Sequence, residues 1–169
     1  EKLIIEHCKF NINFNYIILR YFNPLGYHPS GLLSDKFSDD NLVPNLIKKL
    51  KNNKSFLIYG KDYSTKDKTA VRDYIHINDL ISAHVLSLKK FSRNKNQIFN
   101  VGLGKGHSVL EVVHSFEKVL NKKIKIKYTK RRPGDSEKIY CSSSKIKQKL
   151  KWMPKFSLLD MCKHSIAVL

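Results

Sequence analysis

Two segments of this chain combine residue types that suit a phosphorylated ligand. The first runs from Arg20 to Gly31 and places an amide, Asn23, directly after an apolar stretch. The second runs from Val71 to Asp79 and contains Arg72 among apolar residues. A guanidinium is a forked, permanently charged donor that suits a diphosphate. The alternative for Arg72 is an internal ion pair with an acid, and the residue types leave both uses open.

The residues around these segments predict strands that alternate with helices. The run from Tyr16 to Phe22 is rich in β-formers and predicts a strand buried on both faces of a parallel sheet. Asn23 would then lie at the carboxyl edge of the sheet, where α/β folds bind ligands. This alternation predicts an α/β fold. The expected strands are 16–22, 56–59, 71–77, 97–101 and 124–128. The expected helices are 2–9, 41–51 (with one apolar face), 80–88 (capped by Asn78 or Asp79), 108–120 (with capping-box spacing of Ser108 and Glu111), 144–150 and 157–168 (with Leu158 and Leu159 among its inward residues).

A glycine-rich turn from Gly102 to Gly106 lies between a predicted strand and a predicted helix. A dinucleotide-binding loop requires Gly-x-Gly-x-x-Gly and an acid about 20 residues later, at the end of the next strand. Here the third glycine comes one position early, and the next predicted strand ends in Thr129 and Lys130. We therefore interpret this segment as a structural turn.

The charge of the chain is strongly positive. Its 169 residues include 32 Lys and Arg against 14 Asp and Glu, for a formal net charge of +18. A nucleic-acid-binding protein is expected to use Arg for forked contacts, but only 5 of the basic residues are Arg. The densest basic stretch, 122–132, alternates Lys with apolar residues and predicts a strand with one solvated face. We expect no nucleic-acid partner, although the charge can steer an anionic substrate.

Composition excludes several other classes of protein. The hydrophobic fraction of 41% is that of a globular domain. No apolar stretch approaches the roughly 20 residues of a membrane span, and the charged start does not resemble a signal peptide. The three cysteines (Cys8, Cys141 and Cys162) are far apart, which predicts a reducing, cytoplasmic location and no metal site.

The two segments resemble the extended short-chain dehydrogenase/reductase family, and within it the UDP-glucose 4-epimerases. The most specific part is His-Pro-Ser-Gly at 28–31, with Val-Arg-Asp-Tyr-Ile-His at 71–76. The resemblance covers nearly the whole chain. It implies the trailing strands and helices of a Rossmann-type parallel sheet plus a smaller mixed α/β substrate-binding lobe. Residues 1–23 and 71–101 would belong to the NAD-binding domain, and residues 24–70 and 102–169 to the UDP-sugar-binding lobe.

The resemblance also implies roles for single residues. Lys2 falls at the Lys of a Tyr-x-x-x-Lys motif, where it would bind the nicotinamide ribose and lower the pKa of the catalytic Tyr. Tyr21 and Phe22 would lie beside the nicotinamide of NAD. The implied substrate-binding residues are Asn23, Asn41 and Leu42 at the diphosphate, Leu57, Ile58 and Tyr59 at the uracil, Arg72 and Arg132 at the phosphates, Asp135 at the ribose, and Ile139 at a position that tunes room for an N-acetyl group.

The implied reaction is the interconversion of UDP-galactose and UDP-glucose by NAD-dependent oxidation and re-reduction at C4. The catalytic Tyr would lie before Glu1, and the glycine-rich NAD loop does not occur in the 169 residues. We therefore expect a C-terminal part of such an enzyme, inactive by itself and unable to retain NAD. The family is often homodimeric. The alternatives are another NAD-dependent nucleotide-sugar epimerase or dehydratase of the same family, or a non-enzymatic basic binding module.

Overall fold

The structure is a computed structural model, and it describes residues 1–11, 13–30, 41–91 and 96–166. These residues alternate between helices and strands, which confirms the predicted α/β class. The elements are α1 (Lys2–Phe10), β1 (Ile17–Tyr21), β2 (Asn23–Leu25), α2 (Leu42–Lys51), β3 (Phe56–Tyr59), β4 (Val71–His76), α3 (Ile77–Lys89), β5 (Gln97–Val101), β6 (Gly106–Ser108), α4 (Val109–Leu120), β7 (Ile126–Thr129), β8 (Lys138–Ile139), α5 (Ser144–Leu150) and α6 (Leu158–Ile166).

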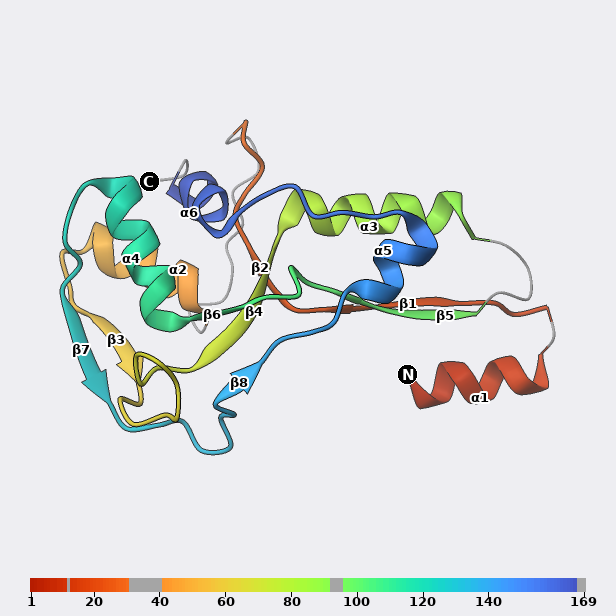
Figure 1. The fold of residues 1–169 in the computed structure, drawn as a ribbon, viewed down its shortest axis with the longest axis horizontal. Helices are drawn as coiled ribbons and strands as arrows, with labels where there is room; N and C mark the ends of the chain where they lie inside the picture. The colour runs from red at the N-terminus through yellow and green to blue at the C-terminus, as the bar shows by residue number, and fades with distance from the viewer. Residues whose placement is uncertain (12, 31–40, 92–95, 167–169) are drawn as a thin grey trace.

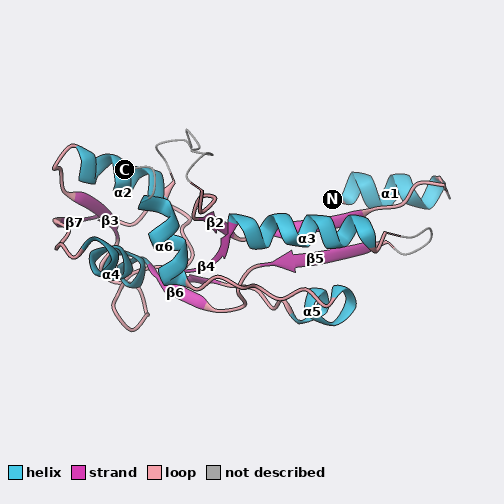
Figure 2. Cartoon of the chain, turned by 90° about the horizontal axis from the view of Figure 1, so that it is seen from above, coloured by secondary structure: helices cyan, strands magenta, loops and turns pink. Residues whose placement is uncertain are grey.

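The strands form three small sheets that divide the molecule into two lobes. The smaller lobe contains the parallel pair β1–β5, with α3 along one side and α1 on the other (Figure 1). The larger lobe contains the parallel pair β3–β7 together with α2, α4 and α6 (Figure 1). Between them, β4 pairs with β2, β6 and β8. Figure 2 shows the same division from above. Strand β4 therefore links the lobes and carries Arg72 between them.

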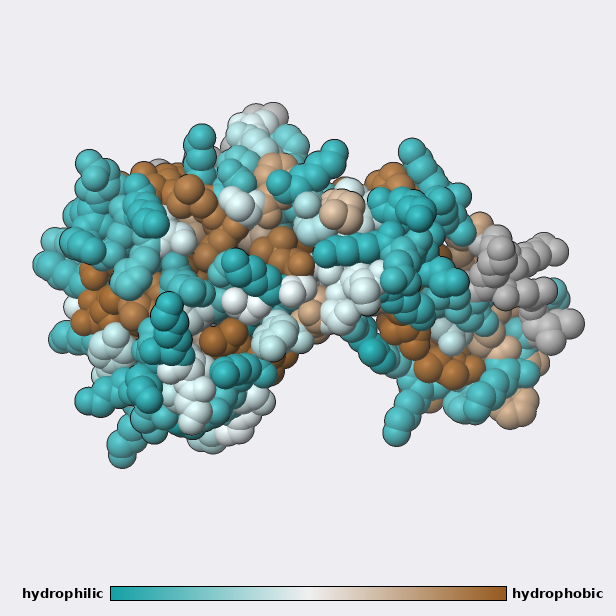
Figure 3. All heavy atoms as spheres, in the orientation of Figure 1, coloured by the Kyte–Doolittle hydropathy of each residue, from teal (hydrophilic) through white to brown (hydrophobic). Residues whose placement is uncertain are grey.

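Strand β1 differs from the prediction of a strand buried on both faces. Ile17, Ile18 and Leu19 are only half-buried, and the two residues that follow are exposed. The physical reason is local: among the described residues β1 pairs only with β5, and α1 has no buried side chain to cover it. Leu3 and Phe10 of α1 are 87% and 86% exposed. Apolar patches reach the surface of both lobes on the face shown in Figure 3.

Each lobe has its own hydrophobic core. In the larger lobe Leu46, Ile58 and Phe116 are fully buried or nearly so, from α2, β3 and α4. The core of the smaller lobe includes Phe99 of β5 and, from the C-terminal region, Trp152. The predicted assignment of residues 24–70 and 102–169 to one lobe stays a prediction. Within that range, Ile146, Leu150 and Trp152 contribute side chains to the core around β5.

The ends of the helices test the predicted caps. Ser108 forms the predicted capping box with Glu111 at the start of α4. The cap predicted for α3 at Asn78 or Asp79 is wrong, because the helix begins at Ile77 and its N-cap is His76. The imidazole of His76 accepts a hydrogen bond from the backbone N–H of Asn78. A histidine is an uncommon cap, so the usual Ser, Thr, Asp and Asn preference pointed to the wrong position.

Three short strands were not predicted. Strands β2, β6 and β8 have two or three residues each, too few for a period-2 pattern. Leu159 of α6 was expected to face inward but is 47% exposed. Gly31 of the His-Pro-Ser-Gly segment and the predicted end of the last helix at Val168 lie outside the described residues.

We expect the stability of the fold to fall in mild acid because of His76. Its Nδ1 accepts from Asn78, so its Nε2 donates to Nδ1 of His164 across 3.0 Å, and Phe156 stacks on the ring. Burial and the neighbouring His164 lower the pKa of His76 to about 4 from 6.5. Between pH 6.5 and pH 4, His76 is protonated in the unfolded chain but remains neutral in the folded chain. The free energy of unfolding should therefore drop by about 2–3 kcal/mol from pH 6.5 to pH 4.

Urea denaturation at several pH values measures this effect. His76→Asn keeps an N-cap acceptor and removes the titrating ring, so its stability should change less over the same range. Asp160 and His28 also face His76 and are unchanged in the variant. Equal pH dependence in both proteins would exclude His76 as the cause.

Candidate functional site

A cavity of about 390 Å³ opens in the larger lobe, a size that suits a small-molecule ligand. Nine of the ten predicted substrate-binding residues line it. They come from separate parts of the chain, which the fold brings together. The lining residues are Asn23, Pro24, Leu25, Asn41, Leu42, Val43, Pro44, Asn45, Phe56, Leu57, Ile58, Tyr59, Ala70, Arg72, Tyr74, Val109, Arg132 and Asp135.

One side of the cavity is charged. Arg72 forms an ion pair with Asp135 and donates a second hydrogen bond to its own segment, at the carbonyl of Val71 (2.7 Å). The internal ion pair considered for Arg72 therefore exists, and its partner is Asp135. A guanidinium has five N–H donors in a fixed plane, so these two bonds orient Arg72 and leave donors for an anion.

Asn23 and the N-terminus of α2 add neutral donors to the same cavity. The amide nitrogen of Asn23 donates one hydrogen bond to the carbonyl of Asp73 (2.7 Å) and carries a second N–H. Asn41 is the N-cap of α2 but makes no side-chain capping bond. The first backbone N–H groups of a helix have no partner within the helix, and the helix dipole adds partial positive charge there. Asn41 and Leu42 both line the cavity, so the arrangement suits an anion.

Strand β3 forms an aromatic and apolar wall. Its side chains alternate: Phe56 and Ile58 are buried in the core, whereas Leu57 and Tyr59 are 37% and 38% exposed. Ile58 therefore belongs to the hydrophobic core and also lines the cavity, whereas Leu57 lines the cavity from the exposed face of the strand. The guanidinium of Arg132 lies over the ring of Tyr59, 4.1 Å from its centre. A flat aromatic ring beside a guanidinium suits a nucleotide, because the base can stack on the ring while the cation contacts the phosphate.

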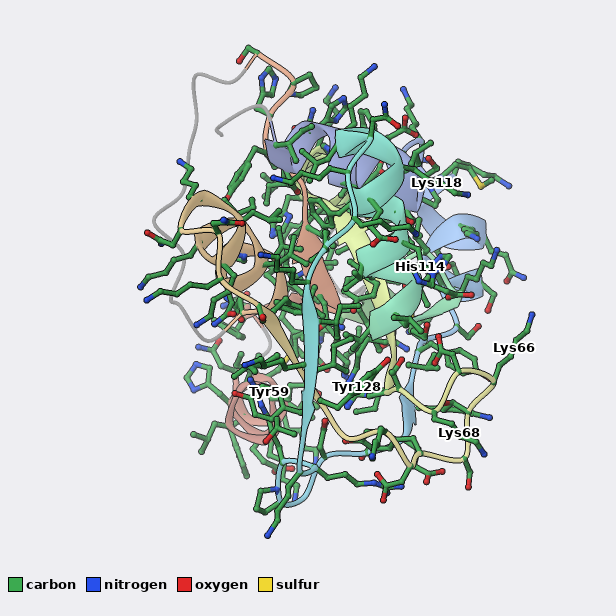
Figure 4. The ribbon with its side chains drawn as sticks, turned by 90° about the vertical axis from the view of Figure 1, so that its left-hand side faces the viewer. Tyr59, Lys66, Lys68, His114, Lys118 and Tyr128 are labelled. Atoms are coloured by element: carbon green, nitrogen blue, oxygen red, sulfur yellow. The ribbon has the colours of Figure 1, made fainter. Side chains whose placement is uncertain are left out.

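Lysine side chains lie on the end of the larger lobe that faces the viewer in Figure 4. Figure 4 shows Tyr59 and Tyr128 on the paired strands β3 and β7, with Lys66 and Lys68 on the loop that follows β3. Lys118 lies on α4 in the same view. This surface charge favours the approach of an anionic ligand.

Ile139 is the predicted residue that does not line the cavity. It lies in β8, is 43% exposed, and pairs with Arg72 between strands. Sequence reasoning in turn missed several residues of the site, of which Tyr63 is the most informative. Its hydroxyl donates to Asp135 across 3.1 Å. Tyr63 lies three residues after Gly60, where a φ of +81° follows the end of β3.

The predicted cofactor-binding residues gather outside the cavity. Glu1 forms a two-armed ion pair with Arg20 (2.7 and 2.9 Å), which places the start of α1 beside the end of β1. Lys2 follows Glu1 in the sequence. Tyr21 and Phe22 lie between Arg20 and Asn23, and Asn23 is part of the cavity wall. The hydroxyl of Tyr21 lies 2.5 Å from Nε2 of His84 on α3, the helix on the other side of β1. The end of β1 therefore forms an exposed edge next to the cavity.

The glycine turn after β5 already holds an anion, and that anion is Asp73. The backbone N–H groups of Leu103 and Gly104 donate to the buried carboxylate of Asp73 at 2.9 and 3.0 Å. A side chain at Gly102 would clash with it, since its Cβ would lie 2.6 Å from Oδ2 of Asp73. The backbone N–H groups that a phosphate would need already donate to Asp73, which supports the interpretation of Gly102 to Gly106 as a structural turn.

Other chemistries receive little support from the described residues. Burial raises the pKa of the Cys141 and Cys162 thiols to about 12, so they are poor nucleophiles. In the described ranges no cluster of His, Cys, Asp and Glu side chains is arranged to hold a metal ion. None of the helices described has the length and apolarity to cross a bilayer.

Comparisons with known proteins agree with this geometry. Residues 1–102 match the family described as the NAD dependent epimerase/dehydratase family. UDP-glucose 4-epimerase 1 of Oryza sativa subsp. japonica is 42% identical over 96% of this chain and 49% of its own length. The bifunctional UDP-glucose 4-epimerase and UDP-xylose 4-epimerase 1 of Pisum sativum is 40% identical over 96% of this chain and 48% of its own length.

A solved structure shows the same fold. The UDP-glucose 4-epimerase from Bifidobacterium longum, in complex with NAD+ and UDP, superposes with a TM-score of 0.93 at 35% identity. The superposition covers 99% of this chain and 51% of that protein. The chain thus spans about half the length of the relatives that it matches.

Proposed function

This chain belongs to the NAD dependent epimerase/dehydratase family, and we propose that it forms the nucleotide-sugar-binding half of an enzyme that interconverts UDP-galactose and UDP-glucose. The observation that carries the proposal is the cavity, in which an aromatic wall, two guanidinium groups and the N-terminus of α2 meet. Such a set of groups suits a base, a ribose and a diphosphate in that order.

The residues of the cavity take distinct parts in this proposal. Tyr59 stacks with the uracil, and Asp135 accepts hydrogen bonds from the ribose. Arg72, Arg132 and Asn23 hold the diphosphate, with the first turn of α2 beside them. The diphosphate is the anchor about which the sugar turns, so that either face of C4 is presented to the same reacting groups. Ile139 stays a prediction for the sugar end, because it lies in β8 outside the lining residues.

The exposed edge next to the cavity fits one end of NAD. Tyr21 is 52% exposed at the end of β1, beside Phe22, and Lys2 provides a cation at the start of α1. In the proposal these three residues contact the nicotinamide and its ribose. When bound, NAD supplies the acceptor and donor for the hydride of C4. The glycine-rich motif that binds the diphosphate of NAD does not occur in the 169 residues.

We also propose a reducing, cytoplasmic setting without nucleic-acid or membrane partners. The three cysteines, which are all free thiols in the structure, support the reducing setting. The predominance of Lys over Arg supports the absence of a nucleic-acid partner. A homodimer remains a prediction from the family.

Joining this chain to the NAD-binding half of the Oryza sativa relative tests the reaction. We expect the fusion to convert UDP-galactose to UDP-glucose, and the 169-residue chain to convert none and to retain no NAD. Chromatography of the sugar nucleotides measures the conversion by each protein. Chromatography of the nucleotides released when the purified chain is denatured measures the retained NAD. A folded fusion that binds UDP but forms a 4-keto-6-deoxy sugar would favour a dehydratase of the same family. Salt-sensitive binding of RNA without binding of UDP would favour the basic module.

A further inference from the structure

Tyr63 is a fully buried tyrosine whose hydroxyl group is directed at the cavity wall. Its exposed fraction is 0%, and its hydroxyl donates to Oδ2 of Asp135 across 3.1 Å. Burial and the neighbouring Asp135 raise the pKa of Tyr63, so the hydroxyl keeps its proton in neutral solution and remains a donor. Tyr63 itself does not line the cavity, whereas Asp135 does.

The ring of Tyr63 has close neighbours over its face and at its edge. The guanidinium of Arg131 lies 4.1 Å from the ring centre on one side. Arg131 is itself fixed, because its Nε donates to Asp62 across 2.8 Å. On another side the ring lies against Gly60, where an added Cβ would lie 2.4 Å from the ring edge. Gly60 also has a φ of +81°, which favours glycine. The position of the hydroxyl is therefore set by its surroundings.

Asp135 needs such support because its own backbone gives little. It lies between β7 and β8, outside any helix or strand, directly after Gly134 with a φ of +74°. Its two carboxylate oxygens have different partners: Oδ1 pairs with Arg72 and Oδ2 accepts from Tyr63. A diphosphate would compete with Asp135 for Arg72. It would not compete for Tyr63, which it cannot reach.

We propose that Tyr63 is a positioning residue that holds the carboxylate of Asp135 in the orientation at which it accepts the ribose hydroxyls of the nucleotide. The inference rests on the proposed function, since it takes UDP as the ligand of the cavity. In this proposal Tyr63 favours the binding of ribose over deoxyribose. Tyr63 acts through Asp135 and does not contact the nucleotide.

Calorimetric titration of the 169-residue chain with UDP and with 2′,3′-dideoxy-UDP tests this assignment. The unsubstituted chain should bind UDP about tenfold more tightly than the dideoxy nucleotide, since hydrogen bonds to a carboxylate are strong. Tyr63→Phe keeps the ring beneath Arg131 and removes one oxygen. It should weaken UDP binding about fivefold and leave the affinity for dideoxy-UDP unchanged. In an Asp135→Ala background, which has no acceptor for the Tyr63 hydroxyl, Tyr63→Phe should cause no further loss.

Tyr128→Phe is the matched control, because Tyr128 lies on β7 outside the cavity lining, and neither affinity should change. Thermal melting checks that each variant is folded. Equal losses for both nucleotides would show a general structural role and overturn the proposal, as would no loss for UDP or no preference for UDP in the unsubstituted chain. If that chain binds no UDP at all, the proposed function itself fails. Retained discrimination in Tyr63→Phe rejects only the role of Tyr63.

Discussion

Arg72→Ala is expected to weaken UDP binding by about a hundredfold or more, since a half-desolvated guanidinium that binds phosphate contributes about 3 kcal/mol. The Arg72 side chain is only 15% exposed, and its ion pair with Asp135 and its bond to Val71 fix it before a ligand arrives. The substitution removes one of the two forked donors that line the cavity. It also frees Asp135, whose negative charge then repels the diphosphate. Titration with UDP measures the loss.

Two variants separate this effect from net charge. Arg20→Ala removes the same side chain from the exposed Glu1 pair, outside the cavity, and should bind UDP normally. Arg72→Lys keeps the charge without the fork and should recover only part of the affinity. Loss of affinity in Arg20→Ala as large as in Arg72→Ala would mean that the overall charge, and not the cavity, controls binding.

Asp73→Ala is expected to lower the free energy of unfolding by about 4 kcal/mol, because it leaves several buried N–H groups without an acceptor. The exposed fraction of Asp73 is 0%, and its carboxylate accepts from the backbone of Leu103, Gly104 and Cys141. It thereby joins β4 to the glycine turn and to the segment after β8. Such a loss is a large part of the stability of a domain of this size. Urea denaturation, followed by the fluorescence of the buried Trp152, measures it.

Asp73→Asn keeps one carbonyl acceptor and should lose about half as much stability. Asp62→Ala is the exposed control, because its carboxylate is 68% exposed and pairs only at the surface with Arg131. That change should leave the free energy of unfolding almost unchanged, because an exposed ion pair contributes little. If Asp73→Ala were as stable as Asp62→Ala, the buried carboxylate would not be the link between these segments.

The order of elements could be predicted because most of them carry a clear pattern. The capping box at Ser108 and the apolar face of α2 are local signals, and the structure confirms the two helices that they predicted. The residues of the cavity were found through motifs that lie in separate segments, such as Arg72 and Asp135. Their joint placement depends on the fold, which brings β2, β3, β4 and the loop before β8 around one cavity.

The misses have physical causes of their own. The burial of β1 depends on which elements pack against its faces and edge. The residues of β1 alone do not indicate whether such elements are present. His76 replaced the expected cap of α3 because its ring is fixed by His164 and Phe156, which lie about 80 residues later in the chain. Tyr63 lies outside the cavity lining, and its bond to Asp135 connects it to the site.

A crystal structure of this chain soaked with UDP tests the central claim most directly. We predict the uracil against Tyr59, the ribose hydroxyls on Asp135, and the diphosphate between Arg72, Arg132 and the N-terminus of α2. Nucleotide density at another surface, or an empty cavity at a UDP concentration that saturates the chain in solution, would contradict the claim that this cavity is a UDP site.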